Sequence, residues 1–270
     1  MCMTVTVFRV VASGWEVTRC LRDRLKVPML GWLPTRGLVD ARDEMPGLVG
    51  VGADPDLVRV KVREQLRDHP VRVKEPFVAL VGDTTVASGA GGLPVLSRAL
   101  VESGTMVVAL VVADDSPVSR LAVRCVAAHA ASVVIVDEHP ALVRATRTLL
   151  GASEPGVVGV DPDDLRLVYA QDGRRAYSSV GVAVGAERSR IAAAQAVEAL
   201  HHRARDFTRS LFVRVSAGPP LRFWEIADAV DVLSRALRDD LVFSAVIDEA
   251  LEDEFEIGVL ATGVDSLRCT

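Results

Sequence analysis

The fold is decided by the stretch FVALVG (77–82), LPVLSRALVESG (93–104), TMVVALVV (105–112), SRLAVRCVAAHA (119–130) and SVVIV (132–136). The apolar runs have the length of buried strands, and the stretches between them have the spacing of amphipathic helices. Strand followed by helix, repeated, is typical of βαβ units that build a parallel sheet. Ligands of such sheets bind at the loops that follow the strands, so these loops are the first candidates for a site.

Beyond about residue 175 the pattern predicts a smaller mixed sheet. Further apolar runs are SSVGVAV (178–184), LFVRVSA (211–217), LVFSAVI (241–247) and FEIGVLATG (255–263), with helical stretches at 187–204 and 223–237. The last two runs are separated by only a turn, which favours a mixed sheet carrying two helices. We therefore predict an α/β protein with a Rossmann-like domain at 1–137, a connecting helix and loop at 138–172, and a smaller α/β domain at 173–270.

Composition narrows the classes of partner. Half of the chain is apolar but only 4% is aromatic, as expected for strands covered on both faces. The net charge is −5, and the basic residues do not cluster beside aromatic ones, so we expect no nucleic-acid partner. The N-terminus lacks the pattern of a signal peptide, and no uncharged run approaches the roughly 18 residues of a membrane span. We expect a cytoplasmic protein that does not insert into membranes.

Several other side chains have structural interpretations. The cysteines are isolated, so we expect neither a metal site nor a redox pair; they are Cys2, Cys20, Cys125 and Cys269. His139, before a proline, is interpreted as a surface or capping residue. Phe223 and Trp224 begin a predicted helix and are interpreted as core residues.

Five segments, in order along the chain, resemble the tubulin/FtsZ family. They are GVGADPDLV (50–58), VASGAGGLPVL (86–96), GVVGVDPDDLRLV (156–168), VRVSAGPPLRFWEIADAV (213–230) and VLATG (259–263). The resemblance is collinear from near residue 5 to near residue 264. It implies a nucleotide-binding α/β domain, a core helix and a second domain. It also implies protomers that stack head to tail, so that a loop of one completes the GTPase site of the next.

The family's phosphate-binding signature, G-G-G-T-G-[ST]-G, corresponds here to residues 85–91, TVASGAG. Ser88, Gly89 and Gly91 keep its character, and the resemblance implies that they contact phosphates. Val86 departs from it, because a β-branched residue tolerates positive φ poorly. Asp83 places a carboxylate at the mouth, and repulsion of a phosphate about 4 Å away would amount to roughly 1–4 kcal/mol.

Two other phosphate-binding loops of the family are preserved to different extents in this sequence. The first glycine loop corresponds to VASGW at 11–15, which retains only Gly14. The stretch GVGADP at 50–55 is better preserved, and the resemblance implies nucleotide contacts from Gly50, Gly52 and Ala53. Its Asp-Pro pair is equally a common way to begin a helix.

On the base side, the strand at 132–136 leads almost directly into the stretch HPALVRATRTLL at 139–150. The family's intervening helix is therefore expected to be missing. Glu138 falls near the family's base-reading acid, but an acid at the start of a helix is the other interpretation.

The loop that acts on the neighbouring protomer in the family has the pattern N-x-D-x-x-[DE]. Here it reads GVDPDD at 159–164, so the asparagine is lost while Asp161 and Asp164 remain. The resemblance implies that these carboxylates polarise the attacking water. Capping of the helix that begins at Pro162 would also explain them.

The resemblance implies an FtsZ-like cytoskeletal protein that forms, or associates with, head-to-tail filaments, with cell division as the process. GTP binding and hydrolysis are expected to be weakened or lost, so the cofactor is GTP or GDP, or none. The partner would be a second copy of the chain or an intact FtsZ. Two alternatives stay open: a nucleotide-free regulator or cap of filaments of an intact FtsZ, and a Rossmann-like enzyme acting on a small metabolite.

Overall fold

The computed structural model describes residues 9–13, 29–33, 77–102, 104–152, 156–170, 174–237 and 240–265. They belong to two compact units, an N-terminal unit that contains residues 7–143 and a C-terminal unit that contains residues 144–266. The boundary falls inside helix α5 (His139–Leu150), the helix expected at 139–150. The predicted division at residues 137 and 172 stays a prediction.

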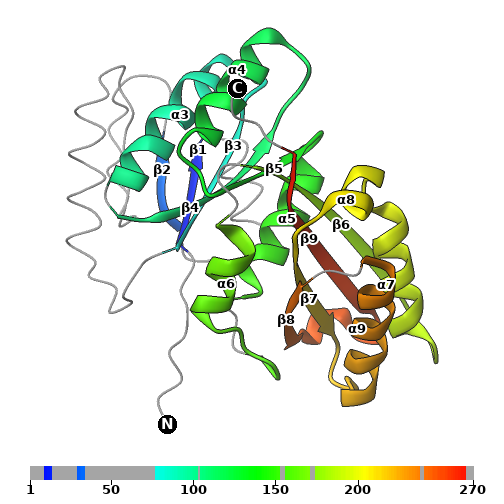
Figure 1. The fold of residues 1–270 in the computed structure, drawn as a ribbon. Coiled ribbons are helices and arrows are strands. Elements are labelled where there is room, and N and C mark those ends of the chain that lie inside the picture. The colour runs from blue at the N-terminus through cyan, green and yellow to red at the C-terminus, as the bar shows by residue number, and fades with distance from the viewer. Residues whose placement is uncertain are drawn as a thin grey trace. The chain divides into compact units, whose positions relative to one another are not determined.

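The N-terminal unit contains a parallel sheet with the order β2-β1-β3-β4-β5 among its described strands (Figure 1). The strands are β1 (Arg9–Ser13), β2 (Met29–Leu33), β3 (Phe77–Asp83), β4 (Met106–Val112) and β5 (Ser132–Val136). Val, Leu and Ala fill β3 and β4, whose residues are almost all buried. Burial on both faces explains why these runs are continuously apolar instead of alternating.

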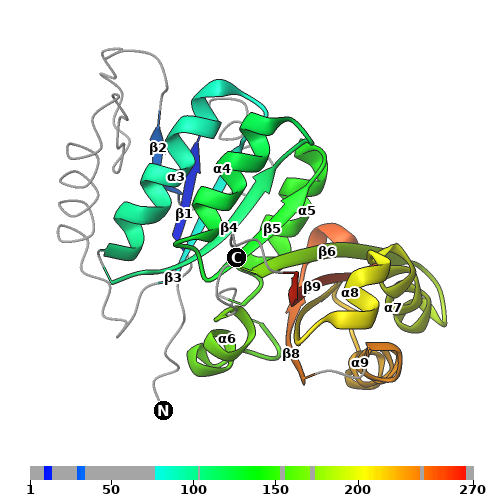
Figure 2. The ribbon, with the colours of Figure 1, turned by 45° about the horizontal axis from the view of Figure 1, so that its top comes forward.

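Helices α3 (Ala87–Glu102) and α4 (Pro117–Ala127) lie side by side on one face of this sheet (Figures 1 and 2). Alternate residues of the strands, such as Val78 and Leu80, pack against them in one hydrophobic cluster. Helix α4 begins at Pro117 because the Ser116 hydroxyl accepts a hydrogen bond from the Ser119 N–H, and proline suits the first helical position.

The C-terminal unit contains a mixed sheet with the order β6-β9-β7-β8 among its described strands. Its elements are α6 (Pro162–Tyr169), β6 (Arg174–Ala183), α7 (Arg188–Ala199), α8 (His202–Phe207), β7 (Ser210–Ala217), α9 (Phe223–Leu237), β8 (Asp240–Ile247), η1 (Glu249–Leu251) and β9 (Phe255–Asp265). Strand β9 runs antiparallel to β6 and β7, whereas β7 and β8 are parallel. The expected α/β fold is confirmed, with parallel strands in the N-terminal unit and mixed strand pairing in the C-terminal unit.

Opposite faces of the mixed sheet carry different helices. Helices α7 and α9 pack on the face that presents Leu211 and Val213 of β7 (Figure 1). Helix α6 packs on the other face, where the Tyr169 ring lies 6.2 Å from that of Phe212 and the Thr262 hydroxyl donates to the Val168 carbonyl. In the described part of the chain, no helix is both long and apolar enough to cross a bilayer.

The first residues of α9 differ from the sequence interpretation. Phe223 is 72% exposed and Trp224 49%. The interpretation of Phe223 and Trp224 as core residues is therefore wrong: helix α9 buries Glu225 and Ile226 instead.

Candidate functional site

The candidate nucleotide site lies at the carboxyl ends of β3, β4 and β5 in the N-terminal unit. Three loops meet this edge, at residues 83–86, 113–116 and 137–138. The edge of a parallel sheet beyond its carboxyl ends is where ligands of such folds bind. The structure therefore brings the β3–α3 turn, with its predicted phosphate-binding residues, and Glu138 to one edge of one sheet.

Asp83 ends β3 and is the centre of a closed polar cluster. The residue is buried, with only 6% of its surface exposed. The Thr85 N–H and hydroxyl both donate to Oδ1, at 2.8 and 2.5 Å. Nε2 of His139 lies 3.1 Å from Oδ2, although the approach lacks the alignment of a hydrogen bond. The carboxylate expected at the mouth is thus turned inward and held by the turn and by α5.

His139 is a residue of this site that the sequence interpretation took for a surface or capping residue. Its side chain is about one-third exposed, and it joins the first turn of α5 to the end of β3. A separation of 56 positions hides such a contact from any local pattern. The one available signal was the position of His139 just after β5, because side chains that follow neighbouring parallel strands converge at one edge.

Thr84 fixes the turn to the next strand and helix. Its N–H and hydroxyl both donate to the Val112 carbonyl, at 2.8 and 2.9 Å. Its hydroxyl oxygen also lies 2.6 Å from that of Ser119 in α4. In the neighbouring loop, hydrogen bonds from the Ser116 hydroxyl and N–H lower the pKa of Asp114, so this exposed carboxylate stays ionised. Hydrogen bonds thus join the β3–α3 turn to β4 and α4, and the edge carries the carboxylates of Asp83 and Asp114.

The two signature glycines have different surroundings. A Cβ at Gly89 would lie 1.7 Å from the Asp83 carbonyl oxygen, so glycine lets the first turn of α3 pack onto the end of β3. A Cβ at Gly91 would meet nothing within 4 Å. Gly89 therefore has a packing role in this turn, whereas no packing contact requires glycine at position 91.

The other predicted nucleotide contacts lie differently. Gly14, Gly50, Gly52 and Ala53 lie outside the described residues. The backbone of Ser88 belongs to the first turn of α3. Glu138 is exposed and its carbonyl accepts from the Leu142 N–H, as at the start of a helix. The contacts of these residues with a nucleotide stay predictions.

The loop before α6 lies on the C-terminal unit and is anchored to β8. The Val157 N–H donates to the Ala245 carbonyl, and Val158 forms an antiparallel bridge with Ala245. A Cβ at Gly156 would lie 2.3 Å from that carbonyl oxygen, so the loop can approach β8 only with glycine there. The contacts with β8 therefore fix the loop that precedes Asp161 and Asp164.

Asp161, which ends this loop, and Asp164, in the first turn of α6, are both exposed. Asp161 caps α6, since its Oδ1 accepts from the Asp163 N–H at 2.8 Å. Asp163 pairs with Arg166 one turn later. Capping thus accounts for Asp161 and helical pairing for Asp163, while the structure gives Asp164 no comparable bond within its own helix. A role of Asp161 and Asp164 toward a neighbouring protomer stays a prediction.

Comparisons with known proteins agree on one family. Residues 175–265 match the model of the FtsZ family, C-terminal domain. The chain is 26% identical over 272 residues to the cell division protein FtsZ of Coxiella burnetii, covering 88% of this chain and 70% of that protein.

Solved structures give the same result for the fold. The empty FtsZ dimer of M. jannaschii matches with a TM-score of 0.74 and 17% identity, over 97% of this chain and 90% of that one. CetZ2 from Haloferax volcanii, in a GTPγS-bound protofilament, matches with a TM-score of 0.69 and 18% identity, over 96% and 94% of the chains.

Proposed function

This chain belongs to the tubulin/FtsZ family, and from that premise we propose that it is an FtsZ-like cytoskeletal protein that forms or joins head-to-tail filaments with weakened or absent GTP turnover. The proposal places it in the cytoplasm and in cell division, the process named for its relative from Coxiella burnetii. Its proposed cofactor is GTP or GDP, or none.

Self-association is supported by both the relatives and the loop before α6. A solved FtsZ of M. jannaschii is a dimer, and the solved CetZ2 of Haloferax volcanii is a protofilament. In this chain the anchored loop at 156–161 and the first turn of α6 expose Asp161 and Asp164 on the C-terminal unit. In the proposed filament this loop would face the next protomer's nucleotide edge.

The observation that carries weakened nucleotide binding is the Asp83 cluster. Asp83 ends the strand that leads into α3, whose first turn carries the positive end of the helix dipole and would otherwise attract a phosphate. Thr85 donates two hydrogen bonds to one carboxylate oxygen of Asp83, and Nε2 of His139 lies 3.1 Å from the other. A phosphate at this turn would meet a fixed negative charge in a poorly solvated position, where Coulomb repulsion is weakly screened.

We therefore expect Asp83→Asn to bind GTP about tenfold more tightly than the unchanged protein, because about 1.4 kcal/mol of repulsion is removed. Asparagine keeps an oxygen for the Thr85 N–H, so the turn is expected to hold its shape. The measurement is the fluorescence anisotropy of a labelled GTP analogue titrated with each protein.

The matched control is Glu102→Gln, which makes the same change of charge at the opposite end of α3, about 20 Å away by helical rise. It is expected to leave the affinity unchanged. If the affinity for the GTP analogue rises equally in both variants, the change in net charge explains the effect. If Asp83→Asn does not raise the affinity, the Asp83 cluster does not weaken nucleotide binding.

Assembly is tested by sedimentation of the protein with GTP, with GDP and without nucleotide. The proposal expects pelleting that depends on protein concentration and changes less than about twofold with nucleotide. Strict dependence on GTP, with turnover that rises with protein concentration, would instead identify an active polymerising GTPase.

The second candidate function is a regulator or cap of filaments of an intact FtsZ. It is favoured by the exposed Asp161 and Asp164, because the segment that would act on a neighbouring protomer keeps these acids while the phosphate turn is altered. It expects no pelleting of the protein alone, but shorter filaments when it is added to a polymerising FtsZ at equal concentration. Unchanged filament length and mass would remove this candidate.

A further inference from the structure

His139 connects the buried Asp83 carboxylate to the solvent. The Asp83 side chain is 8% exposed and that of His139 is 32% exposed. One carboxylate oxygen, Oδ1, accepts both hydrogen bonds from Thr85, and the other, Oδ2, lies 3.1 Å from Nε2 of His139. In the part of the chain that the structure describes, His139 is therefore the side chain beside this carboxylate that can take up a proton near neutral pH.

The contact between the two side chains suits a protonated ring. Nε2 of His139 is buried and has no aligned hydrogen-bond partner among the described residues. If Nε2 carried no proton, its lone pair would face the Asp83 Oδ2 at 3.1 Å, and the two acceptors would repel each other. A charged ring removes this repulsion, and attraction between opposite charges does not need the alignment of a hydrogen bond. The geometry thus favours a proton on Nε2.

The other charges at this edge favour the protonated ring as well. The first cation of each helix that starts here follows later, Arg98 in α3, Arg120 in α4 and Arg144 in α5. The positive end of the α5 dipole opposes a charge on His139, but it amounts to about half an elementary charge against a full carboxylate charge. The three loops of the edge contain no arginine or lysine and five acids: Asp83, Asp114, Asp115, Asp137 and Glu138.

The net charge of the cluster depends on the proton of His139. With a neutral ring, the Asp83 carboxylate is an uncompensated negative charge at the end of β3. With a protonated ring, the pair of side chains has no net charge. Because the carboxylate is buried, solvent screens this difference weakly. A phosphate at the β3–α3 turn therefore meets less repulsion when His139 is protonated.

We propose that His139 makes the binding of a nucleotide phosphate at the β3–α3 turn dependent on pH. The inference rests on the proposed function, in which Asp83 repels a phosphate at this turn. Histidine is the side chain whose charge changes between about pH 5 and pH 8, so GTP and GDP bind more tightly towards the acidic end of this range. His139 acts through the charge of Asp83 and is a positioning residue.

The test compares the unchanged chain with His139→Gln at about pH 8 and about pH 5.5. Glutamine keeps an N–H donor for the Asp83 carboxylate but takes up no proton. A labelled GTP analogue is titrated with each protein and its anisotropy is followed; the initial slope is proportional to the association constant even where binding does not saturate. The terminal phosphate takes up a proton in the same range, so the two proteins are compared at each pH and this shared effect cancels.

The two association constants are expected to be equal within about twofold at pH 8. At pH 5.5 the unchanged chain is expected to bind about three- to tenfold more tightly, because full protonation offsets the same unit charge that Asp83→Asn removes. The control is His129→Gln, which removes an exposed histidine before β5, at the other edge of the sheet. It is expected to bind like the unchanged chain at both pH values, and circular dichroism checks that each variant folds.

The failure of this inference can be told apart from that of the proposed function. If Asp83→Asn gains affinity at pH 8 but His139→Gln matches the unchanged chain at pH 5.5, His139 does not control the charge and the inference is wrong, while the proposed function stands. Equal losses in His129→Gln and His139→Gln would also overturn it. If Asp83→Asn gains no affinity at pH 8, both fail, because His139 then has no repulsion to offset.

Discussion

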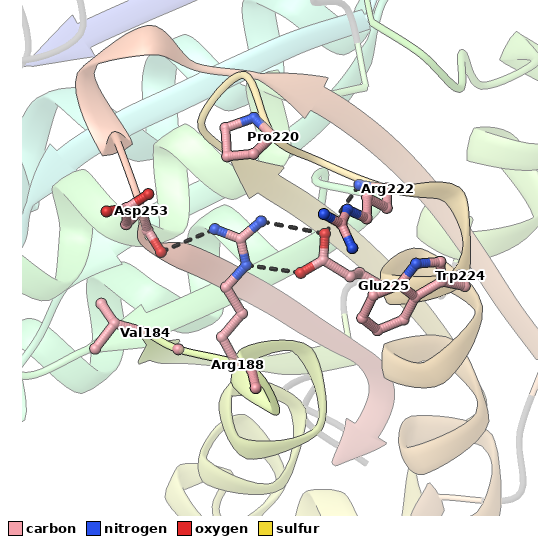
Figure 3. Close-up of a pocket in the computed structure, with 9 residues that line it drawn as sticks. Val184, Arg188, Pro220, Arg222, Trp224, Glu225 and Asp253 are labelled. Carbon is pink, nitrogen blue, oxygen red and sulfur yellow. Dashed lines mark hydrogen bonds and ion pairs between the residues drawn. The ribbon is translucent and has the colours of Figure 1, made fainter.

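Glu225→Ala is expected to lower the free energy of unfolding of the C-terminal unit by about 3–5 kcal/mol. In the pocket that Figure 3 shows, Nε and Nη2 of Arg188 donate to the two oxygens of Glu225 at 2.7 and 3.1 Å. The side chains of Arg188 and Glu225 are only 8% and 5% exposed. Removing the carboxylate leaves the guanidinium buried with two unpaired N–H donors, which is far more costly than losing a pair in water. Urea unfolding followed by far-ultraviolet circular dichroism measures the change.

A neighbouring ion pair provides the matched control. Arg190 and Asp228 join the same two helices at 3.1 Å, but the arginine side chain is 57% exposed. Arg190→Ala is expected to cost less than about 1 kcal/mol. The double variant Arg188→Leu/Glu225→Leu is expected to be more stable than Glu225→Ala, because it leaves no buried charge. A loss below 1 kcal/mol in Glu225→Ala would contradict the assignment of a buried, mutually dependent pair.

The same pair predicts a dependence on pH. Burial acts to raise the pKa of Glu225, but hydrogen bonds from Arg188 and the Arg222 N–H, with the charges of both arginines, lower it on balance. A carboxyl whose pKa is lowered on folding stabilises the fold above its unfolded pKa, about 4.3, and this contribution is lost as the pH falls through the folded pKa. The difference in stability between the unchanged protein and Glu225→Gln is therefore expected to shrink below about pH 4.

Gly89→Ala is expected to destabilise the N-terminal unit by about 3 kcal/mol or more. The new Cβ would lie 1.7 Å from the Asp83 carbonyl oxygen and 2.8 Å from its carbon, and main-chain atoms at the end of a buried strand cannot move aside cheaply. To accommodate alanine, the first turn of α3 would have to lift from β3, which would disturb the Asp83 cluster. Thermal and urea unfolding both report this loss.

Gly91→Ala is the control, since a Cβ there meets nothing within 4 Å. Alanine in a helix is expected to raise stability by about 0.5–1 kcal/mol relative to glycine. The two substitutions are chemically identical and lie two positions apart. If they change the stability in opposite directions, contact with Asp83 is the cause. Similar effects of both would show that the close approach between α3 and β3 does not govern this turn.

Much of the fold could be predicted from hydrophobic patterning. The runs at 77–82, 105–112 and 132–136 match β3, β4 and β5 to within a residue at each end, because buried parallel strands are continuously apolar. The helix at 223–237 is α9 itself. Helix α3 begins six residues before the predicted start at 93, since its first turn is rich in glycine and alanine and lacks an amphipathic pattern.

Local breaks and distant contacts were harder to predict. The helix expected at 187–204 is divided into α7 and α8, with extended backbone at Leu200 and His201 that no glycine or proline announces. The Arg188–Glu225 pair joins residues 37 positions apart. One signal was available: Glu225 is four and eight residues before Ala229 and Leu233, so it lies on the buried face of α9.

The sequence motifs predicted a position for the candidate site but not the contacts between its residues. The family's motifs placed the phosphate signature at 85–91, which covers the β3–α3 turn and the start of α3, and the other loop at 159–164, which leads into α6. The motifs did not reveal that Asp83 is held by Thr85 and His139, because that arrangement depends on the convergence of β3 and β5 at one edge. Asp83, which departs from the family's pattern, is thus hydrogen-bonded to Thr85 within the turn.

The most direct test of weakened nucleotide binding is calorimetric titration of the unchanged protein with GTP and with GDP. The proposal of weakened or absent nucleotide binding, to which the Asp83 carboxylate contributes only in part, predicts a dissociation constant weaker than about 1 mM, or no measurable heat, for both nucleotides. Binding of GTP at about 1 μM would contradict the account, because the turn would then accept a phosphate beside the Asp83 carboxylate.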